Sequence, residues 1–93
     1  MAEDSGALAQ IEQHRQKIDA IDEQIVTLLN ERALQSLQIR DLKPEVHMGL
    51  YDPRREEEIL EKVSAYNKGP LFNDNLRDIY TTILKVMKEA PSL

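Results

Sequence analysis

The stretch IEQHRQKIDAIDEQIVTLLNERALQSLQIRDL, residues 11–42, decides the fold of this 93-residue chain. Positions 11, 14, 18, 21, 25, 28, 32, 35, 39 and 42 alternate steps of three and four, the rhythm of one helix face. Most of these positions form an apolar seam: Ile11, Ile18, Ile21, Ile25, Leu28, Ile39 and Leu42. We therefore predict one long helix that ends near Lys43, because the residue before Pro44 avoids the α conformation.

Several cations lie on or beside this seam. Arg32 occupies a seam position, Arg15 lies one residue off the seam, and Lys43 follows its last member. A cation on a buried face is costly unless an anion meets it, so the pattern predicts an anionic partner from the chain or from a ligand. Arg32 and Lys43 are 11 residues apart, so they face the same way roughly 16 Å apart along the helix axis. Arg15 is roughly 25 Å from Arg32, too far to share a small ligand within one chain.

Two shorter helices are expected after the long one. Asp52-Pro53 is a typical helix start, with a carboxylate N-cap and proline in the first helical position, and this helix should run to about Lys68. Gly69-Pro70 should break it. A third helix should start at Asn73 or Asp74, with an apolar face made of Leu76, Ile79, Tyr80, Ile83, Leu84, Val86 and Met87.

The predicted fold class is all-α, with one long and two shorter helices, because no strand-like alternation is present. Residues 1–93 should form a single domain, with a disordered tail at 1–6, a loop at 44–51 and a turn at 69–72. Asp4 or Ser5 is the expected cap of the first helix.

The length of the first helix predicts a partner. About 40 residues span roughly 60 Å, whereas a compact chain of this size has a radius of gyration of about 12 Å. A second copy is the simplest cover for the seam, so we expect an intertwined helical homodimer. In an antiparallel dimer, Arg15 would reach the partner's pocket.

Composition excludes several classes of function. A formal net charge of −5 argues against nucleic acid or an anionic membrane as the partner. The chain lacks cysteine, which removes disulfides and thiolate metal sites, and its two histidines, His14 and His47, do not make a convincing metal site. No 18-residue apolar run is present and the N-terminus is polar and acidic, so we expect a cytoplasmic protein without a membrane span.

Roughly residues 8–87 resemble the all-helical chorismate mutases. The segments that carry the resemblance are RQKIDAIDEQI (15–25), LLNER (28–32), Lys43, YDPRREEEIL (51–60), NKGPL (67–71) and Ile79-Tyr80. The resemblance implies a dimer with two active sites, each borrowing an arginine from the partner. It also implies the Claisen rearrangement of chorismate to prephenate in phenylalanine and tyrosine biosynthesis, with no cofactor and no metal.

The resemblance also implies roles for individual residues. Arg15, donated by the partner, and Arg32 would hold the substrate carboxylates, and Lys43 would contact the ether oxygen. Asp52 and Glu56 would hold the ring hydroxyl. Arg55 would also bind substrate and would shape the pocket. Of these, Lys43, Arg32 and Glu56 are the expected catalytic residues.

The third helix departs from the family pattern. The family places a serine, and four residues later a glutamine or glutamate, where this chain has Met87 and Pro91. Neither supplies a strong hydrogen-bond donor. Arg40 stands where a glycine is common, which puts close packing there in doubt, and Pro44 follows Lys43 directly.

These departures leave alternatives open. One is a degenerate or regulatory mutase domain with weak activity that acts on a fused or partner enzyme of the same pathway. Another is pyruvate elimination from isochorismate in the same fold, and a third is a plain helical dimerisation module.

Overall fold

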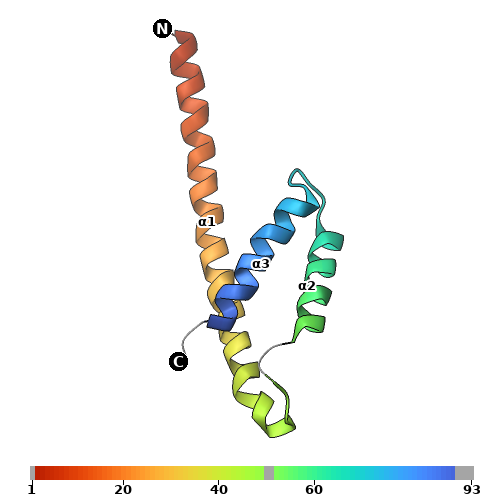
Figure 1. The fold of residues 1–93 in the computed structure, drawn as a ribbon. Coiled ribbons are helices and arrows are strands. Elements are labelled where there is room, and N and C mark those ends of the chain that lie inside the picture. Colours follow the sequence, from red (N-terminus) through yellow and green to blue (C-terminus); the bar gives the residue numbers. More distant parts are fainter. Residues whose placement is uncertain (1, 50–51, 90–93) are drawn as a thin grey trace. The chain divides into compact units, whose positions relative to one another are not determined.

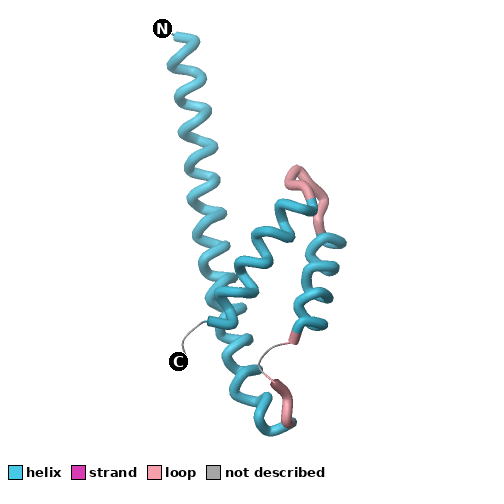
Figure 2. Tube along the Cα trace, in the orientation of Figure 1, coloured by secondary structure: helices cyan, strands magenta, loops and turns pink. Residues whose placement is uncertain are grey.

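The computed structural model describes residues 2–49 and 52–89, the first four of them by their backbone alone. Three α-helices and one short 3-10 helix follow one another in these ranges (Figure 1). No strand occurs in the part of the chain that is described, as the tube in Figure 2 makes clear. The predicted all-α fold with one long and two shorter helices is therefore confirmed.

The long helix, α1, spans Ala2–Leu42. Residues 2–6, for which the sequence predicted a disordered tail, belong to this helix, and Asp4 and Ser5, one of which was expected to cap it, lie inside it. The early start agrees with Ala2, since alanine is the best helix former. Residue 1 lies outside the described residues.

Pro44 ends α1 as predicted, but the segment after it is more regular than a loop. A 3-10 helix, η1, spans Lys43–Val46, with the proline near its start, where the missing N–H is tolerated. The backbone N–H of Met48 donates to the carbonyl of Lys43 at 3.0 Å and closes the turn. The predicted loop at 44–51 is thus helical as far as Val46, and its last two residues, 50 and 51, are not described.

The second α-helix begins where the sequence predicted. Helix α2 spans Pro53–Tyr66, and the Asp52 carboxylate accepts a hydrogen bond from the backbone N–H of Arg55 at 3.0 Å. The backbone N–H of Glu56 donates to the carbonyl of Asp52 at 3.1 Å. The bond from Arg55 satisfies a donor that a helix start otherwise leaves unpaired, and the bond from Glu56 is the first regular backbone bond of the helix, so the first turn of α2 is well defined.

A single asparagine organises the turn between α2 and α3, which spans Asn73–Glu89. The side-chain amide of Asn67 donates to the carbonyl of Leu71 and to the side-chain oxygen of Asn73, both at 2.8 Å. Its side-chain oxygen accepts from the N–H of Gly69 at 2.9 Å, and the positive φ of 77° at this residue suits glycine. This turn reverses the chain so that α2 and α3 pack against each other.

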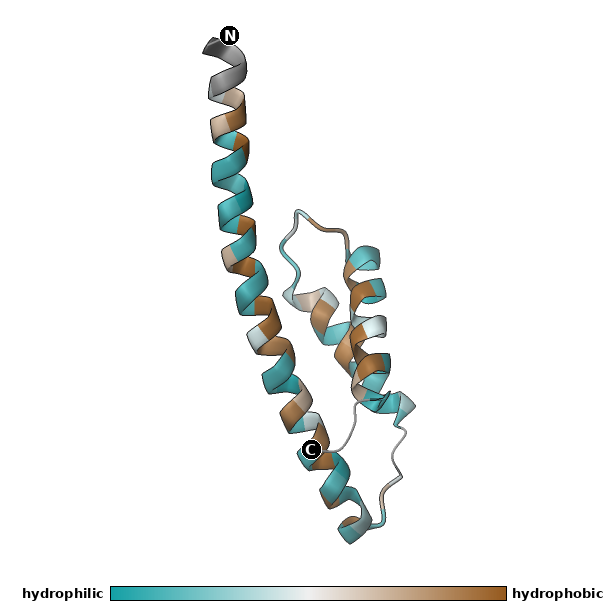
Figure 3. Ribbon diagram, turned by 90° about the vertical axis from the view of Figure 1, so that its left-hand side faces the viewer, coloured by the Kyte–Doolittle hydropathy of each residue, from teal (hydrophilic) through white to brown (hydrophobic). Residues whose placement is uncertain are grey.

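The chain divides into two compact units, residues 1–34 and 35–93. The buried residues Leu37, Val63, Leu84 and Met87 all belong to the second unit, where they form a small core. The first unit is the N-terminal part of α1, and its seam residues are exposed, with 46–61% of Ile11, Ile18, Ile21, Ile25 and Leu28 accessible. Figure 3 shows hydrophobic residues recurring as brown bands along the long helix. Among the described residues, no helix combines the length and the apolar content needed to cross a bilayer.

Candidate active site

The first turn of α2 gathers three of the residues predicted to bind substrate. Asp52 caps the helix by accepting a hydrogen bond from the backbone N–H of Arg55, and Glu56 is the next residue. Asp52 and Glu56 are half-buried, whereas Arg55 is exposed. The capping role of Asp52 is therefore established, and part of its carboxylate is engaged by the helix backbone.

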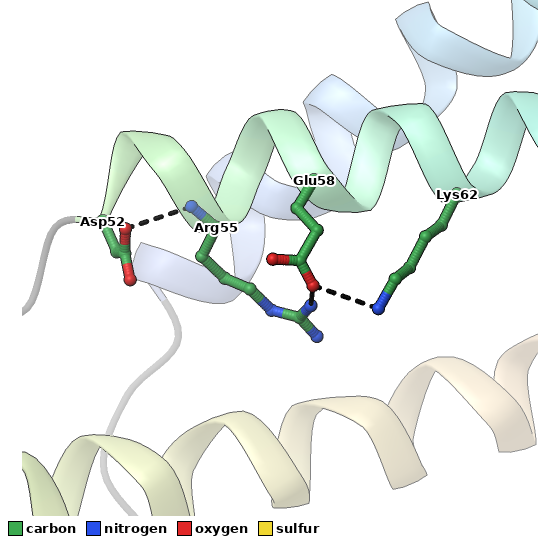
Figure 4. A network of polar contacts seen from close by, with 4 residues as sticks. All are labelled: Asp52, Arg55, Glu58 and Lys62. Carbon is green, nitrogen blue, oxygen red and sulfur yellow. Dashed lines mark hydrogen bonds and ion pairs between the residues drawn. The ribbon is translucent and has the colours of Figure 1, made fainter.

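Arg55 belongs to a network of charges on one face of α2 (Figure 4). Its guanidinium lies 2.7 Å from the Glu58 carboxylate, which also binds the Lys62 ammonium at 3.0 Å. The hydrogen bond and charge of Lys62, followed by the charge of Arg55, lower the pKa of Glu58 below its usual value. The stabilisation from this network is present at neutral pH and is lost as pH falls through that lowered pKa. Because the pairs are exposed, solvent screening keeps their contribution small, and their main effect is to orient Arg55.

Glu56 has a partner that the sequence analysis missed. The ammonium of Lys88, in the last turn of α3, lies 2.8 Å from the Glu56 carboxylate. The neighbouring Met87 is buried in the core between the helices. At this end of α3 the structure thus places an apolar side chain in the core and a cation beside Glu56. Pro91, the other departure from the family pattern, lies outside the described residues.

Arg40 also has a role that was not predicted. Its guanidinium donates to the backbone carbonyls of Met87 at 3.1 Å and Lys88 at 3.0 Å. Carbonyls in the last turn of a helix lack partners within the helix, and a cation there also opposes the helix dipole. Arg40 therefore ties the C-terminal part of α1 to the end of α3. The sequence signal was the basic residue at a position where the family commonly has glycine.

Lys43 is the first residue of η1 and is half-buried. Because Pro44 stops α1 at Leu42, Lys43 sits in 3-10 geometry, whereas the predicted alignment of Lys43 with Arg32 requires one continuous α-helix. The change of helix type alters the rotation of this residue about the axis.

Arg15, beside the seam, and Arg32, on it, both lie in the first unit, on α1. Arg15 is exposed and Arg32 is half-buried. Their separation along one continuous helix remains roughly 25 Å, so a single chain does not bring both to one small ligand. Within residues 2–49 and 52–89, no group of three histidine or acidic side chains is arranged to hold a metal ion.

Comparison with known proteins places these features in one family. The sequence profile described as chorismate mutase type II matches residues 14–90, which is most of the chain. A bifunctional chorismate mutase/prephenate dehydratase from Aquifex aeolicus (strain VF5) is 39% identical over 81 residues, covering 83% of this chain and 22% of that protein. The protein of the same description from Neisseria gonorrhoeae is 37% identical over 71 residues, covering 76% of this chain and 19% of that protein. The chain thus spans about a fifth of the length of these curated relatives.

Solved structures agree with the sequence comparison. The chorismate mutase of Thermus thermophilus in its form I has a TM-score of 0.81 and 33% identity, covering 84% of this chain and 98% of that one. Form II gives a TM-score of 0.84 and 31% identity, covering 90% and 99% of the two chains. Similarity in sequence and in fold therefore extends along nearly the whole of a known mutase chain, and the present chain belongs to the chorismate mutase type II family.

Proposed function

We propose that this chain catalyses the rearrangement of chorismate to prephenate. The observation that carries the proposal is the family match over residues 14–90, which includes every one of the predicted site residues: Arg15, Arg32, Lys43, Asp52, Arg55 and Glu56. The reaction is an intramolecular bond exchange, in which one C–O bond breaks as one C–C bond forms. It needs a folded substrate and stabilisation of charge on the departing ether oxygen.

The proposed roles follow the charges of the substrate. Arg32, and Arg15 of a second chain, hold the two carboxylates and so select the folded conformer. Lys43 stabilises negative charge that develops on the ether oxygen. Asp52 and Glu56 hold the ring hydroxyl, whose single O–H donates to Glu56, and the fixed first turn of α2 supports these two roles.

We further propose that the active form is a homodimer. The exposed seam of α1 supports this, because each Ile or Leu on it would gain about 1.5–3 kcal/mol on full burial. The distance between Arg15 and Arg32 supports it as well, since a second chain can bring its own Arg15 to the other's Arg32. Each of the two sites would then contain residues from both chains.

If the chain is a dimer, its thermal stability should depend on protein concentration. Dilution should lower the thermal midpoint, because a partner that binds only the folded chain stabilises it by mass action. Ile21→Glu should dissociate the dimer, since it puts a carboxylate on the seam, whereas Gln16→Glu adds the same charge on the other side of α1, about 140° from Ile21, and should not. Thermal unfolding at several protein concentrations measures the midpoint, and sedimentation of all three proteins at micromolar concentration measures the fraction of dimer. A stable, compact wild-type monomer would contradict the proposed dimer.

The relatives suggest a partner activity. Those from Aquifex and Neisseria are described as joining chorismate mutase to prephenate dehydratase in one protein. We propose that prephenate made by this chain passes to an enzyme of the same pathway, either fused to it or separate.

A weakly active or regulatory mutase domain is the second candidate. The burial of Met87 favours it, because this side chain fills the core at a position where the family pattern has serine. Such a domain would bind chorismate but turn it over slowly, since the two arginines that hold the carboxylates bind the ground state about as well as the transition state.

Chorismate loss followed in the ultraviolet, with the product identified by mass spectrometry, tests the proposal. We expect prephenate as the product. Chorismate binding with a turnover about 10²–10³ below that of an active mutase would favour the weak domain, because one missing donor to a developing charge typically lowers turnover by this factor. Release of pyruvate from isochorismate would instead identify a lyase, and a failure to bind either compound would overturn both candidates.

A further inference from the structure

The ion pair between Glu56 and Lys88 differs from the other ion pairs of the described residues. Glu56 has 26% of its side chain exposed, whereas the carboxylates of Glu57 and Glu58 in the other pairs are 57% and 50% exposed. Charges that are partly removed from water interact more strongly than exposed ones. The pair also joins α3 to the first turn of α2, where three substrate-binding residues are proposed.

Lys88 is held at both of its ends. Its backbone carbonyl accepts a hydrogen bond from the Arg40 guanidinium at 3.0 Å, and its ammonium lies 2.8 Å from Glu56. Arg40 also binds the carbonyl of Met87, which is fixed in the core. The last turn of α3 is therefore anchored to α1 and to the core, so the position from which Lys88 reaches Glu56 is restricted.

Glu56 is restrained from its own side as well. The N–H of Glu56 binds the carbonyl of Asp52, whose carboxylate caps the same turn. A carboxylate has about four lone-pair positions, so one ammonium leaves capacity for a hydroxyl donor. The ammonium also offsets the negative charge of Glu56 beside a substrate that carries two carboxylates.

We propose that Lys88 is a positioning residue of the active site, which holds the Glu56 carboxylate in place for the substrate hydroxyl. This inference rests on the proposed mutase function. Through Lys88, the end of α3 then contributes to the active site, although Met87 on the same turn is buried in the core. The family pattern supplies polar side chains without positive charge from this helix, whereas this chain supplies a cation that acts through Glu56.

Lys88→Met tests the proposal in the full chain with chorismate as substrate. We expect KM to rise about tenfold, because a Glu56 carboxylate without its ammonium partner is no longer held in place for the substrate hydroxyl, while kcat changes much less. Lys88→Arg keeps the charge and should restore most of the affinity. Lys85→Met, at an exposed position one turn earlier in α3, is the matched control and should leave KM unchanged.

A double-mutant cycle separates positioning from a structural tie between helices. If Lys88 acts through Glu56, then Lys88→Met should add little to the KM of Glu56→Gln, because neighbours in one network are not additive. A Lys88→Met variant with a lower thermal midpoint but the wild-type KM would reduce the pair to a structural tie. Fully additive effects would contradict action through Glu56. A wild-type chain that neither binds nor converts chorismate would overturn the proposed function itself, a result distinct from either of these.

Discussion

Lys43→Ala is expected to lower kcat for the rearrangement of chorismate by about 10²–10³. The ammonium of Lys43 is the proposed donor to the ether oxygen, where negative charge develops only as the C–O bond breaks. Loss of a contact made mainly in the transition state lowers kcat and leaves KM less affected. The loss corresponds to about 2.7–4 kcal/mol of transition-state stabilisation.

The matched control for this variant is Lys85→Ala, which removes an exposed lysine from α3. It should retain wild-type kcat. Circular dichroism of both variants checks that helicity is unchanged, since Lys43 lies in the short η1 and not inside α1. Wild-type turnover by a folded Lys43→Ala protein would mean that another group faces the ether oxygen.

Arg15→Ala and Arg32→Ala should each lower kcat/KM at least about 100-fold, because each removes a charged clamp from a substrate carboxylate. The two losses should be similar in size although the residues lie roughly 25 Å apart on α1, since in the proposed dimer they meet in one site. The measurement is the initial rate over a range of chorismate concentrations. An Arg15→Ala protein with wild-type kinetics would place this arginine outside the site.

Local chemistry made much of the fold predictable. Pro44 and Asp52-Pro53 set the end of α1 and the start of α2 because proline and a capping carboxylate act on the backbone next to them. Gly69-Pro70 marked the turn for the same reason. The helix was expected to start after a cap at Asp4 or Ser5, but it starts at Ala2. The same short stretch offers both capping residues and good helix formers, and the observed start agrees with the helix formers.

The contacts between helices were beyond the sequence pattern. Whether Lys88 meets Glu56 depends on the rotation of α3 against α2, which the packing of Met87 and Leu84 sets. Arg40 was noted as unusual, but its bonds to the end of α3 require the two helices to be placed side by side. Of the predicted site, the first turn of α2 follows from local signals, whereas the contributions of Arg15, Arg32 and Lys43 rest on the family match and stay predictions.

Mixing the Arg15→Ala and Arg32→Ala chains tests the central claim, a mutase site shared between two chains, most directly. A heterodimer of the two variants contains one site with both arginines and one site with neither. Random exchange of subunits should therefore restore about a quarter of all sites to wild-type turnover. Native mass spectrometry confirms that the heterodimer has formed. Recovery of chorismate turnover to that level is the result expected here, and no recovery in a sample that contains the heterodimer would contradict the shared site.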